Sequence, residues 1–109
     1  MTTWSRTYYE DEDLWLYFET DERDWAVRHI EIGGKDGRPR AAASLQEVLH
    51  LRNHADLAAT TRYEQRYGIL ADAPLDGWQD QPRATEITAE EFERLWAEAR
   101  RGLGGGGCP

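Results

Sequence analysis

Three β-prone runs follow one another at the start of the chain, and only four polar residues separate each run from the next. The runs are TWSRTYY (3–9), LWLYFET (14–20) and WAVRHIEI (25–32), with EDED (10–13) and DERD (21–24) between them. Connections this short and polar join neighbouring strands as hairpins. GGKDG (33–37) supplies residues that accept a positive φ in a tight turn, and RPRAAA (38–43) is compatible with an edge strand. The sequence therefore predicts an antiparallel β-meander of three to four strands.

After the strands, the spacing of apolar residues changes from that of strands to that of helices, and a capping box marks each of two helix starts. In SLQE, Ser44 can cap a helix with Glu47 three residues on, and the pattern stays helix-compatible as far as Gly68, as one bent helix or two short ones. Residues 71–82 hold two Pro and one Gly and predict a loop anchored by Trp78, before a short strand within 83–87. Thr88 and Glu91 open a helix over 89–101. The fold class is α+β, a meander packed by two or three helices.

The composition limits the chain to one small domain. Leu, Ile, Val and Phe together number 18 of 109 residues, which alone would suggest disorder, but five Trp and five Tyr can replace the missing aliphatic residues. We therefore expect a single α+β domain over residues 1–101 with an aromatic-rich core. The sequence predicts that residues 102–109, GLGGGGCP, form a flexible Gly-rich tail.

Net charge is −8 and is spread unevenly. Residues 1–24 carry eight acidic and two basic side chains, whereas residues 25–71 carry five acidic and seven basic ones. Such a field repels nucleic acid and favours a protein partner with a basic surface. We expect a cytoplasmic protein without a signal peptide or membrane span, since no basic-then-apolar leader and no run of 18 apolar residues occurs.

The two acidic connections are the candidate partner-binding residues. They lack the Gly and the following Glu of a calcium loop, so they are either solvated turns or an acidic recognition surface. A strand separates the two turns by roughly 20 Å, which rules out one shared carboxylate site. The candidate residues are Glu10, Asp11, Glu12, Asp13, Asp21, Glu22 and Asp24.

Motifs for catalysis or cofactors are not found. His50 and His54 have the i, i+4 spacing of two metal ligands on one helix, but a zinc site needs a third ligand. GGKDG lacks the remainder of a phosphate-binding loop, and neither Ser5 nor Ser44 has the sequence context of a nucleophile. We predict a non-enzymatic protein without a cofactor, with His50 and His54 as surface histidines or, alternatively, a metal pair.

The tail offers a second kind of chemistry. Gly-Gly termini are used by ubiquitin-like sulfur carriers, some of whose precursors carry extra residues that are trimmed. Gly106, Gly107 and Cys108 are the candidate positions for such modification, and an exposed Cys is reactive. The body departs from the β-grasp order, because three or four strands precede the first helix.

The order of motifs resembles one known family. LWLYFETDERDWAVRHIEI, the KDG turn and ATEITAEEFERLW, within residues 14–37 and 83–96, resemble a small bacterial α+β domain family of unknown function. Residues 38–75 depart from the family, which has a short polar loop where this chain has a helical insertion. The resemblance implies a compact α+β domain and brings no activity with it. It favours a binding role because some small domains of this type occur near toxin systems.

These observations rank three functions. The first is a non-catalytic acidic protein-binding module, such as an immunity-type inhibitor that covers a basic toxin surface. The second is a carrier or scaffold modified or trimmed at its tail. The third is a small metal-dependent accessory protein that uses His50 and His54.

Overall fold

The computed structural model describes residues 2–54, 56–70, 80–81 and 83–103, which form one sheet and three helices. Its elements, in chain order, are β1 (Thr3–Tyr9), β2 (Leu14–Thr20), β3 (Ala26–Gly33), β4 (Pro39–Ser44), α1 (Leu45–His54), α2 (Leu57–Tyr67), β5 (Thr85–Glu86) and α3 (Ala89–Leu103). The predicted α+β class is confirmed.

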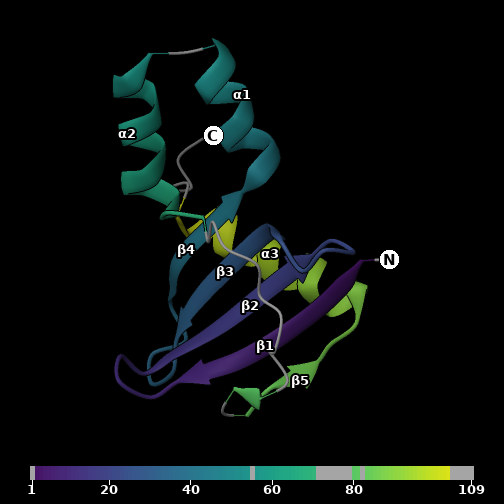
Figure 1. Cartoon of the computed structure of the whole chain (residues 1–109). Helices are drawn as coiled ribbons and strands as arrows, with labels where there is room; N and C mark the ends of the chain where they lie inside the picture. Colours follow the sequence, from purple (N-terminus) through teal and green to yellow (C-terminus); the bar gives the residue numbers. More distant parts are fainter. Residues whose placement is uncertain (1, 55, 71–79, 82, 104–109) are drawn as a thin grey trace.

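The sheet is an antiparallel meander in the spatial order β4-β3-β2-β1-β5 (Figure 1). β1 and β2 pair along their whole length, from Thr3 opposite Thr20 to Tyr9 opposite Leu14. The two-residue β5 adds a fifth strand on the outer side of β1, where Ser5 faces Glu86. The sheet therefore contains the predicted meander and gains one short strand from the segment before α3.

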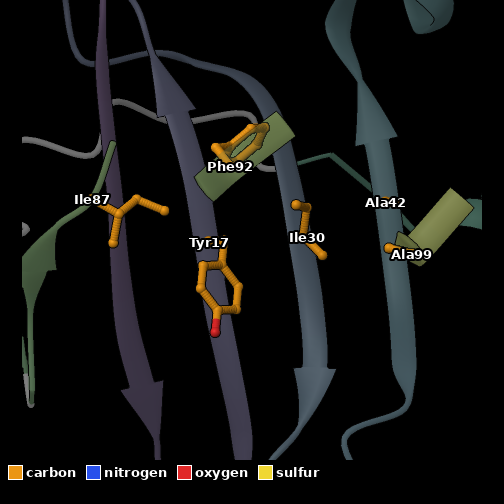
Figure 2. Close-up of a cluster of buried hydrophobic side chains, with 6 residues drawn as sticks. All are labelled: Tyr17, Ile30, Ala42, Ile87, Phe92 and Ala99. Carbon is orange, nitrogen blue, oxygen red and sulfur yellow. The ribbon is translucent and has the colours of Figure 1, made fainter. Parts of the chain in front are cut away.

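Helix α3 packs on one face of the sheet and completes the core. Tyr17, Ile30 and Ala42 lie opposite one another on three adjacent strands and point toward the helix (Figure 2). From α3, Phe92 is completely buried against them. The other members of this buried cluster are Ile87 and Ala99.

The sequence predicted an aromatic-rich core, but the fully buried cluster does not show one. Two of its six residues, Tyr17 and Phe92, are aromatic, and the indoles of Trp4, Trp15 and Trp96 pack around it while still partly exposed. An indole is large and its N–H needs a partner, which places it at the border of a small core. Trp4 shows this, because its Nε1 donates to a carboxylate on β2 at 3.1 Å.

Helices α1 and α2 form a hairpin that stands beyond the end of β4 (Figure 1). The predicted Ser44 cap is confirmed, with the backbone N–H of Glu47 3.5 Å from Ser44 Oγ. The helical stretch divides into two helices, because Asp56 begins α2 by accepting a hydrogen bond from the N–H of Ala59. None of the residues of α2, all of which the structure describes, is buried. The hairpin is therefore a projection from the domain rather than part of its core.

Helix α3 ends two residues beyond the predicted end of the helix. Thr88 caps the helix as predicted, but the helix continues through Gly102 to Leu103 instead of ending at residue 101. Leu103 packs against the core cluster, and a Cβ on Gly102 would lie 2.9 Å from Pro39 Cγ. This close packing keeps residues 102 and 103 in the body of the domain.

Candidate functional site

The first acidic connection is a turn held by one of its own carboxylates. Asp13 has a φ of 54° and folds inward, where Tyr8 donates its hydroxyl proton to Asp13 Oδ1. The backbone N–H of Lys35 donates to Asp13 Oδ2 at 3.0 Å, and that of Gly34 donates to the Asp13 carbonyl at 2.8 Å. The hydrogen bond to Asp13 raises the pKa of Tyr8. Asp13 is thus a structural residue, whereas residues 10–12 remain exposed.

The second acidic connection is organised in the same way around Asp21. Its Oδ1 accepts hydrogen bonds from the backbone N–H groups of Arg23, at 2.8 Å, and Trp25, at 3.0 Å. Asp24 takes a φ of 64°, a conformation that Asp tolerates better than most residues. This turn fixes Trp25 at the entrance to β3 with 40% of its surface exposed.

The exposed indole borders a pocket of about 340 Å³ between the second turn and the helical hairpin. Its apolar walls come from Trp25, from Leu45 and Val48 on α1, and from Ile69 and Leu70 after α2. Polar groups at its edge come from Asp21, Arg52 and Glu64, and the remaining lining residues are Ala26 and Gly68. We call this cavity the Trp25 pocket.

Gly68 explains how the chain reaches this pocket. It ends α2 with a φ of 89°, and its N–H donates to the Glu64 carbonyl at 2.9 Å. A Cβ at this position would lie 2.6 Å from the Cβ of Ala41 on β4, so any larger residue would push the chain away from the sheet. Because Gly68 allows this approach, Ile69 and Leu70 turn back to line the Trp25 pocket.

The surface around the Trp25 pocket combines apolar groups with carboxylates. Ile69 is 71% exposed, and Leu49, one helical turn after Leu45, is 41% exposed. Asp21, Glu22, Asp24 and Glu64 outnumber the nearby Arg23 and Arg52. An exposed apolar patch with a polar rim is typical of an interaction site.

The first acidic turn lies at the other end of β2 and is remote from the Trp25 pocket. Since β2 is seven residues long, its ends are separated by about 20 Å at roughly 3.3 Å per residue. The predicted partner-binding residues therefore belong to two separate surfaces. Asp21, Glu22 and Asp24 are near the pocket, and Glu10, Asp11 and Glu12 are not.

A second cluster of charged groups ties α3 to the helical hairpin. Arg100 donates from Nε to the Ala42 carbonyl at 2.9 Å and from Nη1 to Glu47 Oε2 at 3.0 Å, and its Nη2 donates to Glu47 Oε1. Tyr63 donates its hydroxyl proton to Glu47 Oε1 at 2.6 Å and accepts from the Ser44 N–H at 2.9 Å. All the polar atoms involved have partners, so this cluster acts as a structural clamp.

The pKa values in the clamp agree with that role. Burial and then the Glu47 carboxylate raise the pKa of Tyr63 to about 12. Burial alone would raise the pKa of Glu47, but hydrogen bonds from Arg100 and Tyr63 lower it. These shifts stabilise an ionised Glu47 and a neutral Tyr63, a pairing suited to holding the helices together.

The histidines do not form a metal centre among the residues that the structure describes. No group of three or more His, Cys, Asp or Glu side chains comes together there. His50 is exposed on α1, the side chain of His54 lies outside the described residues, and His29 is buried in β3. The predicted tail positions Gly106, Gly107 and Cys108, and the predicted anchor Trp78, also lie outside them.

Sequence reasoning identified the second acidic turn but missed the Trp25 pocket. Residues 25, 45, 48, 69 and 70 meet only after three elements have folded. One local signal was available, because Ile69 and Leu70 directly follow the helix-ending Gly68. An apolar pair directly after a helix cap indicates a chain that returns to a hydrophobic surface.

Comparisons with protein-family models, with curated proteins and with solved structures returned no match. The resemblance to a small bacterial domain family therefore stays a prediction based on its quoted motifs. Within the described ranges, no helix is long and apolar enough to span a membrane.

Proposed function

We propose that this protein is a non-catalytic protein-binding module that takes up an apolar side chain flanked by basic residues of a partner protein in the Trp25 pocket. The observation that carries the proposal is the exposure of Trp25 and Ile69 around a pocket edged by carboxylates. An immunity-type inhibitor of a basic toxin is one specific form of this function. Such a partner would be attracted by the net charge of −8.

Each part of the surface has a separate energetic role. Covering an exposed Ile or Trp side chain contributes about 1–2 kcal/mol to association, or roughly five- to thirtyfold in Kd. Carboxylates at the rim chiefly accelerate the encounter with a basic segment and make it sensitive to salt. The hydrogen-bonded turn keeps Trp25 in position, so little conformational entropy is lost when the partner binds.

A displayed random-peptide library selected on the immobilised full-length protein tests the proposal. We expect enriched peptides to combine an aromatic or branched aliphatic residue with neighbouring Lys or Arg. Ile69→Ser should weaken the binding of those peptides at least fivefold. Leu57→Ser is the matched control, because Leu57 is 81% exposed and does not line the pocket.

A second pair of variants tests the carboxylates. Glu22→Gln with Asp24→Asn should slow association and reduce its salt dependence, whereas Glu10→Gln with Asp11→Asn should not. The Asn substitution retains a residue that accepts the positive φ at position 24. Peptides that bind Ile69→Ser as tightly as the wild type, or a selection without a basic preference, would exclude this site.

A further inference from the structure

The α1–α2 hairpin has a second hollowed side that the Trp25 pocket does not use. Leu45, Val48 and Arg52 on α1 face the Trp25 pocket. Glu47, His50 and Leu51 line a groove instead. At about 100° per residue these two sets lie on opposite sides of α1.

The groove runs between α1, α2 and the end of α3. One part, of about 630 Å³, lies beside Arg100, and the other, of about 580 Å³, lies along α2. Leu51, Tyr63 and Tyr67 line both parts and make them continuous. We call this surface the tyrosine groove.

Two parallel rows of side chains on α2 give the tyrosine groove its chemistry. Tyr63 and Tyr67 are four residues apart and their ring centroids are 5.1 Å apart, so the rings form a single aromatic wall. Arg62 and Arg66 repeat the same spacing one residue earlier, which places a row of cations beside the rings. Ala59 adds a small apolar surface at one end.

Neither Arg62 nor Arg66 has a carboxylate partner among the described residues, which is also true of some other arginines, such as Arg38 and Arg52. Arg28, Arg40, Arg94 and Arg100 each form an ion pair, whereas Arg62 and Arg66 form none. Glu47, the carboxylate that lines the groove, is already engaged by Arg100. An acidic protein thus presents a localised, uncompensated positive charge on this side.

The aromatic wall is fixed before any ligand arrives. Tyr63 is held by Ser44 and Glu47, and the Arg100 guanidinium carbon lies 3.8 Å from the centre of the Tyr67 ring. A preformed surface loses little side-chain entropy on binding. The free arginines can therefore supply charge while the rings supply a rigid apolar contact.

We infer that the tyrosine groove docks an extended acidic segment of a partner protein, with carboxylates on alternate residues and an apolar side chain beside them. Side chains four apart on a helix are about 5–6 Å apart, and alternate residues of an extended strand are about 6.6 Å apart on one face. The spacing of Arg62 and Arg66 thus fits two carboxylates at positions i and i+2, and the aromatic wall beside the two arginines offers a contact surface to an apolar residue of the same segment. This role goes beyond the proposed function, because it uses the other side of the hairpin and ligands of opposite charge.

The test uses a capped synthetic peptide, Ser-Glu-Ser-Glu-Ser-Leu-Ser, titrated into ¹⁵N-labelled full-length protein. We expect amide chemical-shift changes confined to α1, α2 and the end of α3. The affinity for the peptide should fall several-fold between about 50 and about 300 mM salt, because salt screens the attraction between the charges. Arg62→Gln with Arg66→Gln should weaken binding at least fivefold. Lys35→Gln with Arg38→Gln, the same charge change at the distant β3–β4 turn, should leave it unchanged.

Three results would overturn the inference. They are the absence of shifts at millimolar peptide, equal binding of the peptide with Gln in place of Glu, and wild-type affinity in the Arg62→Gln, Arg66→Gln variant. Shifts in α2 that instead follow the concentration of the protein itself would assign the groove to a second copy, and tighter binding of a single-stranded oligonucleotide would assign it to nucleic acid. The Ile69→Ser variant should bind the acidic peptide normally, which separates a failure here from a failure of the proposed function.

Discussion

His29 should make the domain sensitive to mild acid. The imidazole lies in β3, is 3% exposed, and packs beside Phe18 with ring centroids 6.0 Å apart. Burial lowers its pKa from the ordinary value of 6.5 to about 4. Replacing it with Gln, which is similar in size and does not titrate, removes this effect while leaving every other titrating group in place.

The sign and size follow from the difference between the two pKa values. Above pH 6.5 the imidazole is neutral in both states and has no effect on the free energy of unfolding. Below pH 6.5 the unfolded chain takes up a proton that the folded protein does not, so stability falls until the folded imidazole is also protonated, near pH 4. At about 1.4 kcal/mol per pKa unit, His29 alone removes roughly 3 kcal/mol over this interval.

Glu31 limits this loss. Its Oε2 lies 3.7 Å from His29 Nε2, so an ionised carboxylate would favour the imidazolium. Burial, with a smaller effect of Glu12, raises the pKa of Glu31, and protonating Glu31 in acid relieves an unfavourable buried charge. Both effects oppose that of His29, which makes 3 kcal/mol an upper bound.

Urea unfolding followed by tryptophan fluorescence at several pH values between 7.5 and 4.5 provides the assay. The pH-dependent contributions that the carboxylates make in both proteins cancel in the difference between the unfolding free energies of the wild type and His29→Gln. We expect this difference to be constant above pH 7 and to shift in favour of the variant by 1–3 kcal/mol at pH 4.5, on the order set by the pKa difference. Parallel curves for the two proteins over the whole range would show that His29 is not buried as a neutral side chain.

Three further experiments probe the packing and the clamp, each by urea unfolding at pH 7. Phe92→Ala should cost about 3–5 kcal/mol because the ring is fully buried, and a smaller loss would show that the core can close around the cavity. Gly68→Ala should cost about 2 kcal/mol or more, and Gly37→Ala only about 1, since both residues have a positive φ but only the first approaches a methyl group on β4. Arg100→Lys keeps the charge but loses the two-pronged contact with Glu47 and should cost about 1–3 kcal/mol, with no further loss when Glu47→Gln is added.

Features determined by neighbouring residues could be predicted from the sequence. The bounds of β1 and β2, the caps at Ser44 and Thr88, and the turn at 33–37 depend on alternation and on side chains within four residues. The choice between one helix and two was left open because the signal at Asp56 is a single capping residue. The extension of α3 was missed because Gly102 reads as the start of a flexible tail.

Features determined by distant residues could not be predicted in the same way. Arg100 meets Glu47 across 53 residues, and the backbone of Lys35 meets Asp13 across 22. In the sequence Asp13 and Asp21 could not be distinguished from the other acids of their turns. In the structure the Asp13 carboxylate accepts from the Tyr8 hydroxyl and the Lys35 N–H, and that of Asp21 accepts from two backbone N–H groups. The Trp25 pocket likewise depends on the path of the chain after Gly68.

The shallow attachment of the α1–α2 hairpin has a consequence for how its two sides communicate. Because α2 has no buried residue, the hairpin depends on the Arg100 clamp and on the contact of Gly68 with β4. Regions of this kind open at a lower free energy than the whole domain. An opened hairpin would present neither the Trp25 pocket nor the tyrosine groove. A partner bound on one side would therefore favour the closed hairpin and raise the affinity of the other side, linking a basic ligand to an acidic one through local folding alone.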